Sequence, residues 1–162
     1  MALAVVAGCG NGSSSMESVI SASFSNLVGA NTSGVAMSSM NAGCDYGATG
    51  GLHCTASEAP NNFGRVVTVS FDGAIVAGMD YPIGGAQNAG VLFTDPTDFG
   101  TASGMRPWQA VPGTGAVHIV AFSPSTMHLG FSYYASMQAL SSPATGTFDL
   151  AGDGNVNTLV AR

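Results

Sequence analysis

The sequence predicts an all-β fold, either an antiparallel β-sandwich or a flattened barrel with two long loop regions. Residues 20–25 alternate strictly between serine and less polar side chains, and residues 65–71 form an alternating run rich in valine. Residues 113–137 hold two runs of β-branched and aromatic residues separated by Ser-Pro-Ser-Thr. Alternation indicates half-buried strands, and a Pro/Ser connection between two such runs indicates a hairpin.

The segment 14–29 carries a second, competing pattern. Its apolar residues also recur at helical spacing, which would make one stripe of Met16, Val19, Ile20, Phe24 and Leu27. Serine is a weak helix former, and this segment is rich in serine. We therefore favour a first strand that points three side chains inward, namely Ile20, Ala22 and Phe24.

The predicted hairpin at 113–137 is the central element of the fold. We expect Phe122 to lie opposite Met127, and Val120 to lie opposite Leu129. This register directs one face into the core: His118, Val120, Phe122, Met127, Leu129, Phe131 and Tyr133. The other face is also largely apolar, so we expect both faces to be covered over part of the hairpin.

Two segments, 30–63 and 94–113, are rich in turn residues and are interpreted as the two long loop regions. Together they hold the candidate binding-loop residues Tyr46, His53, Arg106 and Trp108. For the single tryptophan, packing over the core is the simpler interpretation, with contact to a sugar as the alternative. A closing strand is expected at 146–150, with Phe148 and Leu150 inward.

The charge composition excludes one large class of partner. Only 7% of the residues are charged, the three basic residues are all arginines, and the formal net charge is −6. Such a chain cannot neutralise a run of phosphates, so nucleic acid is not an expected partner. A surface of small uncharged residues is typical of an exported protein, and 162 residues suit one domain.

The N-terminus resembles a bacterial lipoprotein signal. Val6-Ala7-Gly8-Cys9 places small residues before a cysteine, and a Gly/Ser-rich tether follows. We therefore interpret residues 1–15 as a signal remnant and tether with Cys9 as the lipidation site, and 16–162 as a single β-domain. The apolar run is short and no basic residue precedes it, which indicates a start placed too late or a trimmed signal. The alternative is a short edge strand at 2–7 with Cys9 as a buried thiol.

The two remaining cysteines, Cys44 and Cys54, are predicted to form a disulfide in an oxidising compartment. The competing interpretation is a metal site made from Cys44, Asp45, His53 and Cys54. It lacks the close cysteine spacing and the second histidine that zinc sites use.

Catalytic motifs are missing from the sequence, so no catalytic residue and no cofactor is assigned. It contains no Gly-x-Ser-x-Gly, His-Glu-x-x-His or Gly-x-Gly-x-x-Gly, and without lysine there is neither a P-loop lysine nor a Schiff base. The spacing of Asp153, Asn155 and Asn157 is weakly calcium-like, but a turn explains it more simply. A hydrolase would have to pair His53 or His118 with a carboxylate: Asp45, Asp95 or Asp98.

The order of these features resembles small exported bacterial lipoproteins of unknown function with an all-β domain. The features that carry the resemblance are the lipobox-like Val6-Ala7-Gly8-Cys9, the tether, the valine-rich strand and the closing Gly146-Thr147-Phe148. It implies a β-domain tethered to a membrane and transfers no catalytic residues.

Three functions follow as hypotheses. The favoured one is a non-enzymatic, membrane-tethered lipoprotein, a binding or envelope-structural module on the periplasmic or cell-surface face of a bacterial membrane. Its partners would be the membrane, through the lipid anchor, and a carbohydrate or protein ligand. The alternatives are a secreted hydrolase with a His/Asp pair and a self-assembling extracellular subunit with an unblocked edge strand.

Overall fold

The computed structural model describes residues 17–47, 50–59, 64–97 and 104–162. Within these ranges the chain forms strands and one short 3₁₀ helix, η1 (Pro124–Thr126). The strands are β1 (Val19–Val28), β2 (Ala36–Ser39), β3 (Ala42–Tyr46), β4 (Leu52–Ser57), β5 (Val66–Phe71), β6 (Asp80–Pro82), β7 (Gly90–Pro96), β8 (Met105–Ala110), β9 (Ala116–Ser123), β10 (His128–Ala139), β11 (Thr147–Val156) and β12 (Leu159–Ala161). No helix in these ranges is long and apolar enough to cross a membrane.

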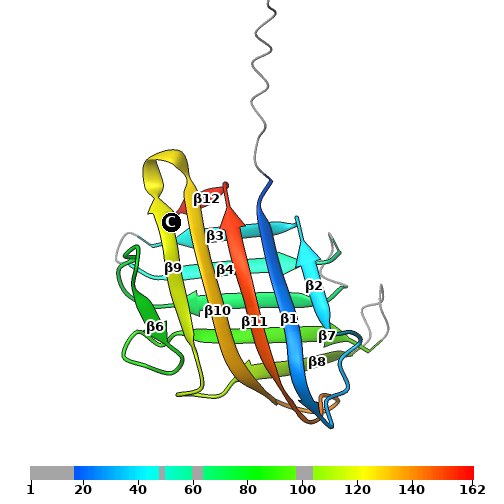
Figure 1. The fold of residues 1–162 in the computed structure, drawn as a ribbon. Helices are drawn as coiled ribbons and strands as arrows, with labels where there is room; N and C mark the ends of the chain where they lie inside the picture. The colour runs from blue at the N-terminus through cyan, green and yellow to red at the C-terminus, as the bar shows by residue number, and fades with distance from the viewer. Residues whose placement is uncertain (1–16, 48–49, 60–63, 98–103) are drawn as a thin grey trace, which may run out of the picture.

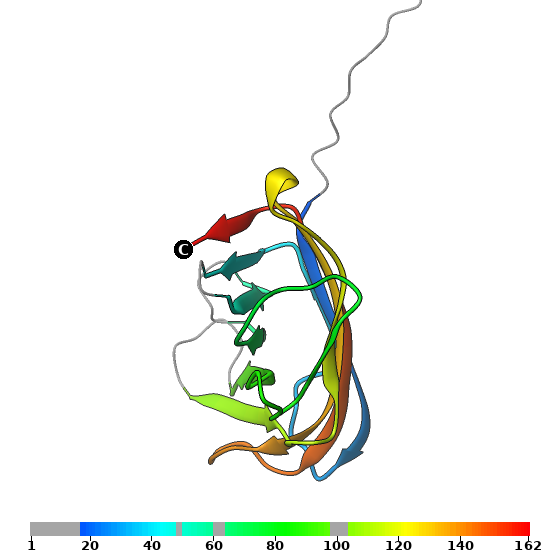
Figure 2. The same ribbon diagram turned by 90° about the vertical axis from the view of Figure 1, so that its left-hand side faces the viewer.

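The strands form two layers, so the predicted all-β, sandwich-like fold is confirmed. The front layer has the order β6-β9-β10-β11-β1-β2, and the back layer has the order β12-β3-β4-β5-β7-β8. The back strands run crosswise behind the front strands (Figure 1). Figure 2 views the two layers from the side, with one layer opposite the other. The end of β10 joins the layers, because Met137–Ala139 pair with β8. Neighbouring strands are antiparallel except β12 and β3, which are parallel.

Aromatic side chains fill the space between the layers. Phe93 contacts the rings of Phe24, Trp108 and Phe148 at centroid distances of 4.9, 5.8 and 5.9 Å. Trp108 is fully buried, and its Nε1 donates a hydrogen bond to the carbonyl oxygen of Thr145 at 3.1 Å. The interpretation of Trp108 as a packing residue is therefore confirmed.

The strands predicted at residues 20–25 and 65–71 form as expected. In β1 the inward residues are Ile20, Ala22 and Phe24, each less than 10% exposed. In β5 the inward residues are Val67, Val69 and Phe71. These strands alternate without interruption, so the sequence pattern maps directly onto buried and exposed faces.

The predicted register of the hairpin is wrong. Phe122 pairs with Leu129 rather than with Met127, and His118 pairs with Ser132. The register shifts between these pairs, which leaves Val120 as the extra residue of a bulge. A bulge reverses the alternation on one side of it. Val117 and Ile119 therefore point into the core.

Three further expectations for the hairpin are also wrong. His118 is partly exposed, and its side chain keeps 42% of its accessible surface. Val120 and Met127 are 62% and 56% exposed rather than inward. Tyr134 on the opposite face is 58% exposed, so the outer face of the hairpin is not covered.

The two long loop regions also need correction. The segment 30–63 contains β2, β3 and β4, and the segment 94–113 contains the end of β7 and all of β8. These strands consist largely of small or weakly β-forming residues. Strand formation there depends on pairing with neighbours and on burial rather than on intrinsic propensity.

The edge strands are short. Among the described residues β2 has four residues, and β6 and β12 have three each. Short edges give little backbone for another chain to pair with. Self-assembly through an edge strand thus remains a prediction without structural support.

The closing strand is longer than predicted. Phe148 and Leu150 point inward as expected, but β11 continues to Val156, so the interpretation of residues 153–157 as a turn is wrong. Gly154 pairs with Phe131 on β10. A Cβ atom at Gly154 would lie 2.2 Å from atoms of the Phe131 ring. The glycine therefore makes room for an aromatic ring within the strand.

We expect Gly154→Ala to lower the free energy of unfolding by about 1 to 3 kcal/mol, because the new methyl group must displace a buried ring. Gly43→Ala is the matched control. Gly43 also lies in a strand, but no atom would come within 4 Å of its Cβ. Urea denaturation measures both variants, and equal stabilities would contradict this packing argument.

Candidate functional site

The structure separates the four candidate binding-loop residues. Trp108 is buried in the core, and Arg106 on β8 forms an ion pair with buried Asp95 at 3.1 Å. Tyr46 ends β3 and packs edge-on against Phe122, with ring centroids 5.6 Å apart. His53 on β4 is the open member of the set, with a side chain 48% exposed. The prediction that these four residues share one binding loop is therefore wrong.

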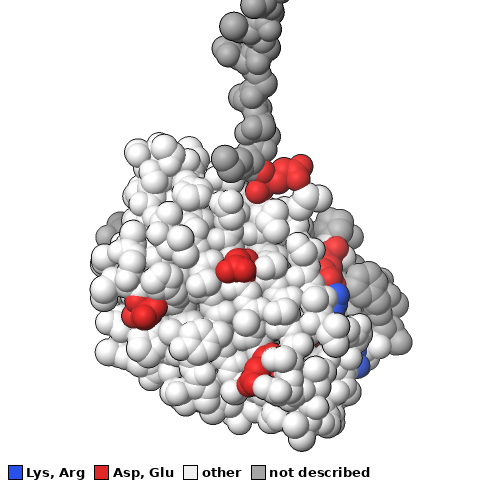
Figure 3. Space-filling model, viewed as in Figure 1, with Lys and Arg blue, Asp and Glu red and all other residues white. Residues whose placement is uncertain are grey.

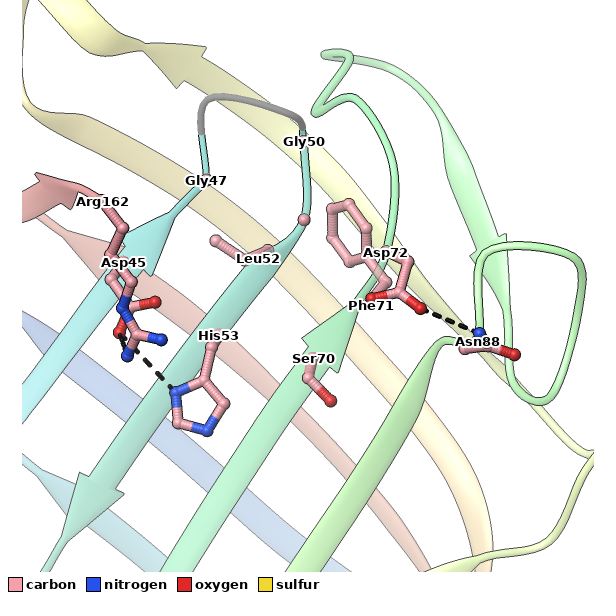
Figure 4. A pocket seen from close by; sticks show the side chains of 11 residues that line it. Asp45, Gly47, Gly50, Leu52, His53, Ser70, Phe71, Asp72, Asn88 and Arg162 are labelled. Carbon is pink, nitrogen blue, oxygen red and sulfur yellow. Dashed lines mark hydrogen bonds and ion pairs between the residues drawn. The ribbon is translucent and has the colours of Figure 1, made fainter.

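His53 lies in a pocket of about 290 Å³ on the outer face of the back layer (Figure 4). The pocket is formed by the ends of β3, β4 and β5, by the segment at Asn88 and by the C-terminal residue. Its lining consists of Asp45, Gly47, Gly50, Gly51, Leu52, His53, Ser70, Phe71, Asp72, Asn88 and Arg162.

Strand register places three polar side chains of this pocket in one row. Asp45 on β3 pairs with His53 on β4, and His53 pairs with Ser70 on β5. The neighbouring Cys44 and Cys54 are buried, so the row faces outward. The pairing of three antiparallel strands thus brings an acid, an imidazole and a hydroxyl to one surface.

The disulfide between Cys44 and Cys54 joins the same two strands from the inside. The cysteines are paired across β3 and β4, with their Cα atoms 4.1 Å apart. The competing metal site is therefore wrong, because its two cysteines are bonded to each other and point into the core, whereas Asp45 and His53 point outward.

The rim of the pocket carries two carboxylates, Asp45 and Asp72, and one guanidinium, Arg162. Arg162 Nη2 donates to Asp45 Oδ2 at 2.5 Å, and His53 Nδ1 lies 3.8 Å from the same oxygen. On the other side, Asn88 Nδ2 donates to Asp72 Oδ2 at 2.8 Å. These polar groups already contact one another. A polar ligand that binds at the rim would exchange its hydrogen bonds with theirs.

Of the carboxylates considered for a hydrolase, Asp45 lines this pocket and Asp95 lies apart from it. Asp98 falls outside the described residues. Asp95 is fully buried and accepts hydrogen bonds from Ser33 N at 2.5 Å and Ser33 Oγ at 2.6 Å. Its ion pair with Arg106 gives it a structural role.

A closer His/Asp pair lies at the edge of the front layer, and no motif in the sequence indicated Asp80 as the partner of His118. His118 Nδ1 and Asp80 Oδ1 are 2.6 Å apart on the paired strands β9 and β6. Ser132 on β10 faces His118 from the other side. The pairing of β6 with β9 brings Asp80 beside His118 and so completes this row.

The weakly calcium-like residues do not form a loop. Asp153 and Asn155 lie within β11, and Asn157 follows its end. An extended strand spaces alternate side chains by about 6.6 Å, whereas calcium requires its ligands to converge. Asn155 Oδ1 instead lies 3.0 Å from His128 Nε2.

Asp149 on the front layer is held as a carboxylate. Asn26 Nδ2 donates to it at 2.6 Å and Ser136 Oγ donates at 2.7 Å, and these hydrogen bonds lower the pKa of Asp149. A lowered folded-state pKa stabilises the fold above the unfolded value of about 3.9. That contribution is lost as the pH falls through the lower, folded value.

We expect Ser136→Ala to raise the pKa of Asp149 toward its ordinary value, because one donor to the carboxylate is lost. Carbon NMR titration of the carboxyl group measures the change. Ser132→Ala on the same strand is the control and should leave this pKa unchanged. A pKa of Asp149 unaffected by Ser136→Ala would show that the hydrogen bond does not lower it.

Each of the three arginines is paired with a carboxylate. The pairs are Arg65 with Glu58 at 2.6 Å, Arg106 with Asp95 at 3.1 Å and Arg162 with Asp45 at 2.5 Å. An anionic ligand would have to compete with these carboxylates for the arginines.

Comparison with known proteins adds no family: no family model, curated protein or solved structure matches the chain. The functional argument therefore rests on the residues and geometry described above.

Proposed function

We propose that the chain is an exported bacterial lipoprotein whose single β-domain is a non-enzymatic binding module held at the cell envelope. The observation that carries the proposal is the buried disulfide between Cys44 and Cys54. Disulfides persist in oxidising compartments, outside the cytosol. The low content of charged residues and the lipobox-like Val6-Ala7-Gly8-Cys9 support export. Cys9 lies outside the described residues.

The geometry around His53 favours binding over catalysis. A histidine general base is oriented by the hydrogen bond that its Nδ1–H donates to a carboxylate, and 3.8 Å between His53 Nδ1 and Asp45 Oδ2 is too long for one. Asp45 is instead engaged by Arg162. The pocket of about 290 Å³ then offers its imidazole, guanidinium and carboxylates as ligand contacts.

The anchor is tested by expressing the natural gene in a bacterial host that is fed an alkyne-tagged fatty acid. We expect the protein to carry the tag and to fractionate with membranes, and Cys9→Ser to abolish both. A Cys44→Ala/Cys54→Ala variant is the matched cysteine control and should keep the tag. An untagged wild-type protein would contradict the lipoprotein assignment.

The second candidate function is a hydrolase, and the row of Asp80, His118 and Ser132 is the observation that favours it. In this reaction His118 would take the proton of the Ser132 hydroxyl as the serine oxygen attacks an ester carbonyl, and Asp80 would orient the imidazole. The ester C–O bond then breaks, and His118 would give the proton to the leaving alcohol. Water, deprotonated by His118, would then hydrolyse the acyl–serine ester, release the acid and return the proton to Ser132.

The hydrolase is tested with p-nitrophenyl acetate. If it is correct, Ser132→Ala and His118→Gln should each remove the enzyme-dependent rate, while His128→Gln should keep it. A wild-type rate equal to the buffer rate would eliminate this candidate.

A further inference from the structure

Two hollows meet at Tyr134 on the outer face of the front layer. The larger, of about 530 Å³, is lined by Ser21, Ala22, Ser23, Ala36, Met37, Ser132, Tyr133, Tyr134, Ala151, Gly152 and Asp153. The smaller, of about 260 Å³, is lined by Ser25, Thr114, Tyr134, Ala135, Ser136, Asp149, Leu150 and Ala151. Both hollows are lined by Tyr134 and Ala151 and lie on either side of this pair; together they are here called the Tyr134 groove.

Tyr134 stands at the middle of this groove with an accessible ring. It is 58% exposed although it lies on β10, an interior strand of the layer. Its cross-strand neighbours are Ala116 on β9 and Ala151 on β11, which are too small to cover it. An exposed aromatic ring on a floor of small residues is suited to stacking with a flat ligand.

Carboxylates flank the aromatic ring at matched positions. Asp149 and Asp153 lie two residues before and after Ala151 on β11, so all three side chains share one face. Serines accompany both acids: Ser136 pairs with Asp149, and Ser132 pairs with Asp153. Each half of the groove therefore offers a charged acceptor beside a hydroxyl group that can donate or accept.

The charges of the groove restrict the chemistry of its ligand. Asp149 and Asp153 are the charged members of its lining, and arginine is not among them. In Figure 3 the acidic side chains are scattered over this face, and the basic ones appear at its edge. Phosphorylated, sulfated or uronic acid polymers would be repelled. A neutral ligand that donates hydroxyl hydrogen bonds fits instead.

We propose that the Tyr134 groove binds a neutral polysaccharide, with the C–H face of one pyranose ring on Tyr134 and hydroxyl groups of the adjoining sugars on Asp149 and Asp153. Sugar C–H groups carry partial positive charge, which the face of an aromatic ring attracts. Hydroxyl hydrogen bonds to a carboxylate are short and strong. A groove with a subsite on each side of the ring fits a chain rather than a single sugar.

This inference rests on the proposed binding function, because it names a ligand class for the module, but it does not depend on the lipid anchor. The two claims fail separately. A fatty-acid-tagged protein that binds no sugar would overturn only the inference. An untagged protein that binds sugar through Tyr134 would overturn only the anchor.

Isothermal titration of the full chain, with its disulfide intact, tests the inference. The probes are the neutral hexasaccharides cellohexaose, chitohexaose and mannohexaose, and the acidic polymer polygalacturonate. We expect saturable binding of at least one neutral probe and none of polygalacturonate. Failure of all three neutral probes to bind at millimolar concentration would overturn the proposal, as would preferential binding of polygalacturonate.

Substitutions locate the binding on the groove. Tyr134→Ala should weaken binding by about tenfold or more, whereas Tyr134→Phe keeps the ring and should stay within about twofold. Asp153→Asn should weaken binding several-fold. Met127→Ala removes an exposed apolar side chain elsewhere and should have no effect. Near-ultraviolet circular dichroism checks that each variant is folded, and unchanged affinity in folded Tyr134→Ala would overturn the proposal.

Discussion

Replacing Asp95 by alanine is expected to lower the free energy of unfolding by about 3 to 5 kcal/mol, because it leaves a buried guanidinium without its counter-charge. Asp95 is fully buried, and Arg106 Nη2 lies 3.1 Å from its Oδ2. Arg106 Nε is buried and, among the described residues, has no hydrogen-bond partner even in the intact protein. The substitution also removes the acceptor for Ser33, which ties the β1–β2 connection to β7.

Two controls separate the lost ion pair from a general effect of removing an acid. Asp80→Ala breaks an exposed pair with His118 and should cost less than about 1 kcal/mol. Asp95→Leu combined with Arg106→Met removes both charges and should recover part of the loss. Urea denaturation measures all three. A loss in Asp95→Ala no greater than that in Asp80→Ala would contradict the buried ion pair.

Trp108→Ala should cost about 3 to 5 kcal/mol, the range typical of removing a large aromatic side chain from a packed core. Its ring lies 5.8 Å from Phe93 and 5.7 Å from Phe148, and its indole nitrogen donates to Thr145. Removing it leaves a cavity and an unpaired carbonyl group. Far-ultraviolet circular dichroism should follow unfolding, because the substitution removes the only tryptophan.

Tyr134→Ala is the matched control for Trp108→Ala. Tyr134 is 58% exposed, so its removal should change stability little. If Trp108→Ala were as stable as Tyr134→Ala, Trp108 would not be a core residue, and the alternative interpretation of Trp108 as a ligand contact would return.

The strands that alternate without interruption could be predicted from the sequence. In residues 20–24 and 66–71 one face is apolar, and that face is buried. The predicted register of the hairpin is wrong at Val120, because the bulge there is determined by pairing with β10 and does not change the pattern of apolar residues in the sequence. The strands β3 and β4 were missed because the burial of small residues depends on neighbouring strands.

The candidate sites depend on register even more strongly. His53 and Asp45 drew attention through their nearby cysteines, but Ser70 joins their row only because β4 pairs with β5. Asp80 and His118 are 38 residues apart in the sequence. Tyr134 was expected on a partly covered face, and the hollows on either side of it are lined by residues of β10 and β11 and of β1, which is far from them in the sequence.

The mass of the intact protein, expressed from its natural gene in a bacterial host, extracted with detergent and measured before and after reduction, tests the exported lipoprotein most directly. The account predicts a chain that begins at Cys9, carries acyl groups and gains the mass of two hydrogens on reduction, from Cys44 and Cys54. An unprocessed chain without acyl groups, whose mass does not change on reduction, would contradict it.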